Sequence, residues 1–332
     1  MELVSIICPA YNEEPFIETC IQSVLAQDLP REQWELLIVD GGSTDKTRTL
    51  ISPYLKQYAN IRLLDNPHRT APYAMNIGIE QARGVYVVRI DAHSIFPTNY
   101  ISTLIHYLTT LPNAANVGVS CVTLAANDTM TARAIAFAQS HHFGVGNSVF
   151  RTQIVKQPTL TDTVPFGCWQ KTYLETIGVF DVELTRNQDD ELNARIIKSG
   201  GSIYLVPGLT VKYYARDTLI KTAAMFYQYG LFKPLVNRKT GSPATIRQFV
   251  PLLFVSGLII GLPLCFLSKA IAVLYGLCVL TYMIIDIAIA TRNSNPMLLP
   301  VFPCMHLSYG WGYLTGIMKI IFNRPFTVTS NR

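Results

Sequence analysis

The second apolar run of the chain ends in a polar turn and reads ELLIVDGGS over residues 35–43. An uninterrupted series of Leu, Ile and Val favours a strand that is buried on both faces, as strands of parallel sheets are. Similar apolar runs and helix-like segments alternate before and after it, at residues 4–7, 15–26, 44–58, 61–64, 72–82 and 85–90. This alternation predicts an α/β fold whose mostly parallel sheet has helices on both faces.

Three of these runs are followed by small residues and by side chains that carry chemistry. Residues 8–13 read CPAYNE, residues 40–43 read DGGS, and residues 91–93 read DAH. Each segment alone also fits a turn or a helix cap. Because parallel strands end at one edge of the sheet, where open α/β sheets bind ligands, the three segments together predict a binding site.

Composition excludes several classes of protein. The chain has 332 residues, of which 49% are hydrophobic and 15% charged, with a net charge of +5. It is too apolar for a disordered protein, and it shows no basic cluster interleaved with aromatics that would indicate nucleic-acid binding. Its seven scattered cysteines have no C-x-x-C spacing, which disfavours a disulfide scaffold or a zinc module. No segment has the phosphate-loop spacing of a P-loop NTPase.

The hydrophobic residues concentrate near the carboxyl end, in three runs of about membrane-spanning length. These runs are Phe249 to Leu267, Ala270 to Ala290 and Met297 to Met318. We therefore expect a domain at 1–244, with a nucleotide-sugar half at about 1–115 and an acceptor half at about 116–244. Two to three membrane helices follow at 245–332. Residues 1–12 do not read as a signal peptide, so we expect a multi-pass protein of the cell (inner) membrane with its front in the cytoplasm.

The number of spans is left open by the charges that flank these runs. Basic residues before the first run agree with a cytoplasmic front under the positive-inside rule: Arg238, Lys239 and Arg247. Three full spans would place Lys319, Arg324 and Arg332 on the outer side of the membrane, which the same rule disfavours. The alternative is that one run, such as the proline-containing third, is re-entrant or interfacial.

A set of motifs in the first two hundred residues carries a family resemblance. They are PAYNE at 9–13, VDGGSTD at 39–45, MNIGI at 75–79, ARG at 82–84, DAH at 91–93, GVFD at 178–181 and QDDEL at 188–192. In this order they resemble the family 2 glycosyltransferases, nucleotide-sugar enzymes of the Rossmann-like GT-A fold. The DAH form and the segment GVGNS at 144–148 are most similar to the ExoA-like branch of succinoglycan and exopolysaccharide biosynthesis.

The resemblance implies a nucleotide site. Asp40 stands where the family accepts a hydrogen bond from the base, and Pro9, Tyr11 and Glu13 belong to the loop that frames base and ribose. Arg69 lies at about the position in the sequence where related enzymes present a cation to the nucleotide. The alternative is that Arg69 is an exposed arginine of a loop.

The resemblance also implies a metal site. The family places an Asp-x-Asp motif where this chain has Asp91 and His93, and a divalent cation there neutralises the leaving diphosphate. The imidazole suits borderline transition metals better than Mg²⁺, so Mn²⁺ is expected rather than Mg²⁺. The alternative for His93 is a structural or surface histidine.

For inversion at the sugar, the family uses as base the Asp of a Glu-Asp pair that lies six residues before an Arg. Asp189 lies six residues before Arg195, and Gln188 replaces the usual Glu. Asp190 and Glu191 are alternatives for this role, and an acidic first turn of a helix is the structural explanation.

These expectations predict an inverting, metal-dependent glycosyltransferase. It would move a sugar from a nucleotide-diphosphate sugar, a UDP-hexose, to a lipid-linked (polyprenyl) saccharide in exopolysaccharide or other surface glycan synthesis. A polyprenyl-phosphate sugar synthase and a non-catalytic membrane scaffold with a degenerate nucleotide fold are the alternatives. A processive polymer synthase is disfavoured because residues 228–232, QYGLF, do not match its Gln-x-x-Arg-Trp motif.

Overall fold

The computed structural model describes residues 3–243 and 245–327 and divides the chain into two compact units. The first unit comprises Met1–Val122 with Gln153–Tyr213, and the second comprises Thr123–Thr152 with Tyr214–Arg332. Met1, Ala244 at the expected domain boundary, and Arg332 lie outside the described residues. The expected domain at residues 1–244 stays a prediction. The two compact units divide the chain at other positions.

The amino-terminal half of the sheet is parallel. Its strands run in the order β3-β2-β1-β4. Their bounds are Val4–Ala10 (β1), Trp34–Asp40 (β2), Ile61–Asp65 (β3) and Tyr86–Arg89 (β4). The register pairs Ala10 with Asp40, and Asp40 with Asp65, so these strands end at the same edge.

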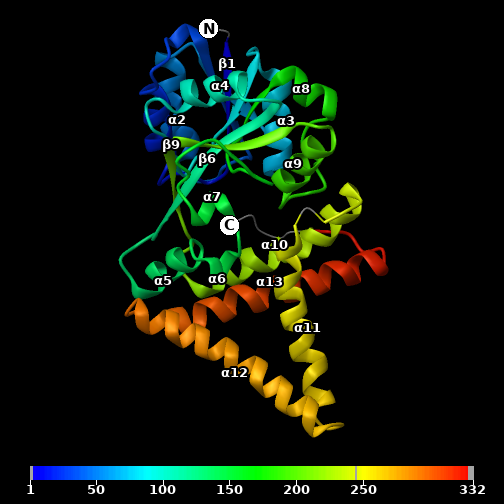
Figure 1. Cartoon of the computed structure of the whole chain (residues 1–332). Helices are drawn as coiled ribbons and strands as arrows, with labels where there is room; N and C mark the ends of the chain where they lie inside the picture. Colours follow the sequence, from blue (N-terminus) through cyan, green and yellow to red (C-terminus); the bar gives the residue numbers. More distant parts are fainter. Residues whose placement is uncertain (1–2, 244, 328–332) are drawn as a thin grey trace. The chain divides into compact units, whose positions relative to one another are not determined.

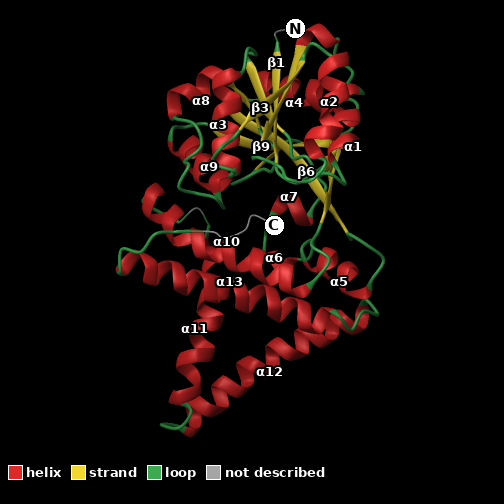
Figure 2. Cartoon of the chain, turned by 180° about the vertical axis from the view of Figure 1, so that it is seen from behind, coloured by secondary structure: helices red, strands yellow, loops and turns green. Residues whose placement is uncertain are grey.

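Helices cover both faces of these strands, as the uninterrupted apolar runs predict (Figures 1 and 2). The parallel strands are joined by α1 (Ile17–Leu25), the 3₁₀ helix Arg31–Gln33, α2 (Thr47–Gln57) and α3 (Ala71–Gln81). Val4, Ile6 and Cys8 of β1 belong to the core that contains residues of α1, α2 and α4 (Tyr100–Thr110). Ile7 faces the other way and lies against Gly78 of α3, where any added Cβ would collide with it. Alternate side chains of β1 are therefore buried on opposite faces.

The remaining strands make the sheet mixed. They follow β4 in the order β8-β6-β9-β5, and β7 also pairs with β9. Their bounds are Ser94–Ile95 (β5), Ala114–Leu124 (β6), Thr159–Leu160 (β7), Cys168–Gln170 (β8) and Ser202–Tyr214 (β9). The associated helices are α4 (Tyr100–Thr110), α8 (Lys171–Ile177) and α9 (Gln188–Lys198). β8 runs antiparallel to β4, so the parallel part of the sheet is its first four strands.

The second unit is helical. Its elements are α5 (Met130–Ala138), α6 (His142–Val145), α7 (Val149–Thr152), α10 (Leu219–Thr240), the 3₁₀ helix Ile246–Gln248, α11 (Phe249–Leu264), α12 (Lys269–Arg292) and α13 (Leu298–Ile321). Within this unit α10 and α13 run side by side in both views (Figures 1 and 2). Glycines allow this close approach, because a Cβ at Gly312 would lie 2.1 Å from the carbonyl oxygen of Tyr227.

Two helices are long and apolar enough to cross a membrane among the residues that the structure describes. They are Ile246–Leu264 and Lys269–Arg292, and both are mostly exposed. The third apolar run forms α13, whose buried face includes Val301, Phe302 and Met305. Two of the three runs are thus candidate spans, within the expected range of two to three.

Candidate active site

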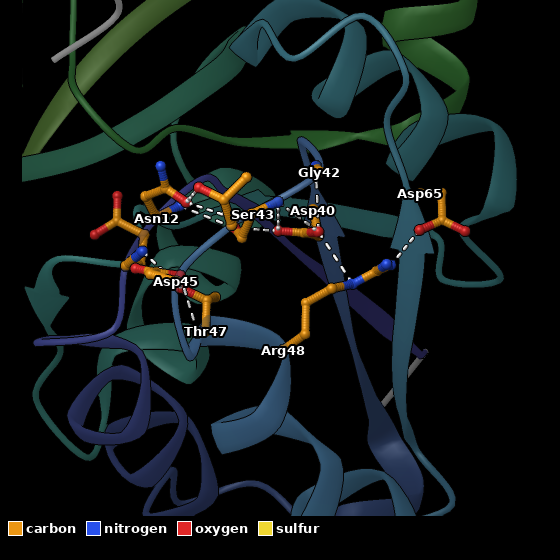
Figure 3. Close-up of polar contacts among 10 residues, drawn as sticks. Asn12, Asp40, Gly42, Ser43, Asp45, Thr47, Arg48 and Asp65 are labelled. Atoms are coloured by element: carbon orange, nitrogen blue, oxygen red, sulfur yellow. Dashed lines mark hydrogen bonds and ion pairs between the residues drawn. The ribbon is translucent and has the colours of Figure 1, made fainter.

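The carboxylate of Asp40, at the end of β2, organises the loop that follows it (Figure 3). It is fully buried and accepts hydrogen bonds from the N–H groups of Gly42 (3.2 Å) and Ser43 (3.1 Å). Arg48 of α2 lies 3.1 Å from one carboxylate oxygen of Asp40 and also pairs with Asp65 at the end of β3. Gly42 takes a φ of +78°, which favours glycine in this turn. Asp40 is therefore placed at the expected edge, and contact with a base stays a prediction.

The loop after β1 is tied to this turn by hydrogen bonds from backbone N–H groups to side-chain oxygens. The N–H of Asn12 donates to the hydroxyl of Ser43 (2.9 Å), and the N–H of Thr44 donates to the amide oxygen of Asn12 (2.8 Å). The N–H of Glu13 donates to the hydroxyl of Thr47 (2.7 Å). Asn12 and Glu13 are thus held beside the Asp40 turn, while Pro9 lies in β1 itself.

Arg69 reaches the same edge through the loop after β3. It takes a φ of +63°, and a Cβ added to Gly41 would lie 3.2 Å from the Cα of Arg69 and 3.4 Å from the Cβ of Tyr11. Gly41 therefore allows three loops to meet. The structure brings Tyr11, Asp40 and Arg69 together, and the Arg69 side chain is exposed.

A second group of charges joins the end of β4 to the first turn of α9. Arg89, the last residue of β4, lies 3.2 and 3.1 Å from one carboxylate oxygen of Asp91 through Nε and Nη2. Its Nη1 forms an ion pair with Asp189 in the first turn of α9. One buried guanidinium thus links Asp91, which is expected to bind the metal, to Asp189, which is expected to act as the base.

The electrostatics of this group favour ion pairing. Burial would lower the pKa of Arg89, but the charges of Asp189 and Asp91 outweigh it and raise that pKa above its ordinary value. Partial burial raises the pKa of the Asp189 carboxyl, and the charge of Arg89 opposes this rise. The Asp189 side chain remains 32% exposed, so a substrate can reach it.

His93 is directed toward a buried carboxylate. Its Nδ1 lies 3.3 Å from Oε1 of Glu13, whose side chain is 6% exposed, and its ring packs edge-on to Phe16 and Tyr213. Within the described ranges, no group of three or more His, Cys, Asp and Glu side chains is arranged to hold a metal ion by itself. Any metal here would need ligands from the substrate in addition to Asp91 and His93.

Glu191, one of the two acidic residues that follow Asp189, pairs with a different arginine. Glu191 is buried and binds Arg195 through both carboxylate oxygens, at 2.6 and 2.8 Å. Arg195 also donates to the carbonyl oxygen of Val179 (2.7 Å), which fixes α9 to the segment after α8. Glu191 therefore fixes α9 in place, whereas Asp189 is the carboxylate that pairs with Arg89.

Sequence reasoning missed Arg89, although a signal exists. It is the charged residue of the strand YVVR, and buried arginines are almost always paired. Trp169 is 2% exposed and packs edge-on to Phe180, so it belongs to the core.

The family model of glycosyl transferase family 2 matches residues 5–172, which contain both strand-end loops and β4. The chain belongs to glycosyl transferase family 2. It is therefore a glycosyltransferase enzyme with the GT-A fold, as expected, and the scaffold alternative is set aside.

Relatives of this glycosyltransferase extend the match beyond the family model. It is 30% identical to the dolichyl N-acetyl-alpha-D-glucosaminyl phosphate 3-beta-D-2,3-diacetamido-2,3-dideoxy-beta-D-glucuronosyltransferase of Methanococcus voltae, over 96% of this chain and 98% of that one. It is 28% identical to the succinoglycan biosynthesis protein ExoA of Rhizobium meliloti (strain 1021), over 74% of each.

A solved structure shares the fold. The mannosyltransferase PcManGT of Pyrobaculum calidifontis, solved in complex with GDP-Man and Mn²⁺, superposes with a TM-score of 0.61 at 18% identity. The match covers 97% of this glycosyltransferase and 88% of that chain.

Proposed function

We propose that this glycosyltransferase moves a sugar, with inversion, from a nucleotide-diphosphate sugar to a lipid-linked saccharide in exopolysaccharide or other surface glycan synthesis. The observation that carries the proposal is the arrangement of Asp91 and Asp189 around Arg89. Both carboxylates contact one guanidinium, which supports a donor-side role for Asp91 and the role of base for the partly exposed Asp189.

In the proposed reaction, Asp189 accepts the proton of the attacking acceptor hydroxyl. The hydroxyl oxygen forms a bond to the anomeric carbon on the face opposite the leaving group, and the bond from that carbon to the diphosphate oxygen breaks. The nucleoside diphosphate leaves with the electron pair, and Asp189 keeps the proton. The raised pKa of Asp189 makes it a better proton acceptor than an ordinary aspartate.

The donor nucleotide is assigned to the loops that meet at Gly41. Asp40 would accept a hydrogen bond from the base, Pro9, Tyr11 and Glu13 would frame base and ribose, and Arg69 would contact the phosphates. The hydrogen bonds that join these loops support this assignment because a preorganised loop costs little to order on binding. UDP is the proposed nucleotide, attached to a hexose.

Asp91 and His93 would hold a divalent metal, with further ligands supplied by the donor diphosphate. Asp91 keeps one carboxylate oxygen outside its contacts with Arg89. Nδ1 of His93 lies 3.3 Å from the Glu13 carboxylate, and a carboxylate in this place orients the imidazole as supporting carboxylates do at metal-binding histidines. When bound, the metal would stabilise charge on the leaving diphosphate. A mixed oxygen and nitrogen donor set favours Mn²⁺ over Mg²⁺.

The lipid-linked acceptor agrees with the two apolar helices. Two spans, α11 and α12, would return the chain to the side from which it entered. Arg238, Lys239 and Arg247 before α11 would then share the cytoplasmic side with Lys319 in the last turn of α13 and Arg324 after it, as the positive-inside rule requires. The printed name of the Methanococcus voltae relative, which acts on a dolichyl-phosphate-linked sugar, supports the same acceptor class. We therefore propose a multi-pass protein of the cell (inner) membrane.

The test is release of nucleotide from a panel of UDP- and GDP-sugars by the full-length protein in detergent. Mn²⁺, Mg²⁺ or EDTA is added, together with lipid-linked saccharides or bare polyprenyl phosphate. We expect one UDP-sugar to be used with metal and a lipid-linked saccharide, and Asp189→Asn to lose about 10² to 10⁴ in rate. Asp190→Asn, in the same helical turn, is the matched control.

Three results would contradict parts of this proposal. Full activity of Asp189→Asn would remove Asp189 as base, and full activity in EDTA would remove the metal. Transfer to bare polyprenyl phosphate in place of the saccharide would establish the alternative, a polyprenyl-phosphate sugar synthase.

A further inference from the structure

Arg89 occupies a position that the expected binding and catalytic residues leave unexplained. Its side chain is 8% exposed, and its guanidinium contacts both Asp91 and Asp189. Its backbone is fixed as well, because its N–H donates to the carbonyl oxygen of Gly167 (3.0 Å) and its strand pairs with Ile7 of β1. Few rotamers are open to a side chain held in this way at both ends.

The contact with Arg89 makes the two oxygens of the Asp189 carboxylate different. Oδ1 is held by Nη1 of Arg89. Among the residues that the structure describes, none donates a hydrogen bond to Oδ2. Because the side chain is partly exposed, Oδ2 is the oxygen that a substrate hydroxyl can approach.

Arg89 is also the counter-charge for more than one carboxylate. Asp91 and Asp190 both raise the pKa of Asp189 by like-charge repulsion, in addition to the rise caused by burial. Carboxylates that share a site without a cation retain a proton, and a protonated Asp189 could not accept one. The charge of Arg89 opposes this outcome.

We propose that Arg89 is a positioning residue, which presents Oδ2 of Asp189 to the acceptor hydroxyl and keeps that carboxylate ionised. This inference rests on the proposed role of Asp189 as base. One side chain thus has two functions. Its planar guanidinium orients the Asp189 carboxylate, and its positive charge keeps that carboxylate ionised. A lysine supplies the charge but not the fork, so the two functions can be separated by substitution.

The experiment compares Arg89→Lys, Arg89→Met and Arg62→Met in the full-length protein, after circular dichroism has shown that each variant is folded. The reaction is measured with the donor and acceptor that the wild type uses. We expect Arg89→Lys to lower kcat roughly 100-fold, as misplacement of a reacting group does, while the acidic limb of the pH profile stays in place. Arg89→Met should lose as much activity and also move that limb upward by about one pH unit or more.

Arg62→Met is the matched control. Arg62 lies on β3 of the same sheet and contacts buried Glu35 (3.4 Å), so its loss also removes an arginine from a buried carboxylate. It should change neither kcat nor the pH profile. The proposal is overturned if both Arg89 variants keep the wild-type rate, if Arg62→Met behaves as they do, or if Arg89→Met leaves the acidic limb unmoved.

This outcome is distinguishable from failure of the proposed function. If Asp189→Asn is inactive while both Arg89 variants are normal, Asp189 remains the base and the inference about Arg89 alone is wrong. If Asp189→Asn is fully active, both are wrong.

Discussion

The hydrogen bond between Glu13 and His93 makes the proposed metal site open to a quantitative test. Glu13→Gln keeps the shape of a side chain that is 6% exposed and removes its charge, so His93 loses the carboxylate that orients its ring. Loss of such a supporting carboxylate costs about 10- to 100-fold in metal affinity. The 3.3 Å separation is long for a hydrogen bond, and the His93 side chain is 24% exposed. We therefore expect the lower end, about tenfold or roughly 1.4 kcal/mol.

The assay is calorimetric titration of Mn²⁺ into the full-length protein at saturating UDP. Glu14→Gln is the control, because it makes the same change at the next residue, where the carboxylate pairs with exposed Lys46 at 3.4 Å. We expect the apparent Mn²⁺ affinity to fall about tenfold in Glu13→Gln and to stay unchanged in Glu14→Gln. Overlapping curves for Glu13→Gln and the wild type would refute the reasoning, as would an equal loss in Glu14→Gln.

Two further predictions concern the packing of α13 and the metal preference of the site. Gly312→Ala should destabilise the helical unit by about 1 to 3 kcal/mol, because the added Cβ would lie 2.1 Å from the Tyr227 carbonyl oxygen. The control is Gly257→Ala in α11, where the added Cβ meets no atom within 4 Å and should not lower the midpoint of thermal unfolding in detergent. Equal midpoints for the two variants would contradict the close packing at Gly312. His93→Asp should weaken activity, because the new carboxylate faces buried Glu13, and His93→Asp with Glu13→Gln should recover activity with Mg²⁺. Activity of the double variant no higher than that of His93→Asp would contradict this.

The strands were predictable because burial on both faces removes polar residues from them. Residues 35–39 are apolar apart from Glu35, and β2 is buried along its whole length, Trp34–Asp40. The same argument placed the Asp40 turn and the Pro9–Glu13 loop at one edge, and the structure joins them by hydrogen bonds. Local composition was sufficient here because parallel strands force their ends together.

The contact between Arg89 and Asp189 was not predictable in the same way. Asp189 reaches β4 because β8 pairs antiparallel to that strand and α9 follows later in the chain. No local spacing encodes this path, so the sequence could single out Asp189 and Asp91 but not the side chain that joins them.

The third apolar run shows a different limit. Its composition resembles that of the two candidate spans, but α13 packs along α10 through Gly312 and Gly316, whose added Cβ atoms would collide with α10 carbonyl groups. Hydropathy measures how apolar a run is and not what covers it. A run with small residues on one face therefore cannot be assigned to lipid or to a neighbouring helix from hydropathy alone.

The two departures from the family pattern, His93 and Gln188, have the same effect on the local charge. An aspartate at position 93 would face Glu13, whereas His93 is a partner that can donate a hydrogen bond to it. A glutamate in place of buried Gln188 would add a further carboxylate beside Asp189, where Arg89 is already shared with Asp91. Both departures remove a negative charge next to an existing one. Random loss of site residues would not be expected to remove negative charge at both positions. We therefore infer that His93 and Gln188 are adaptations of the proposed site and not signs of its degeneration.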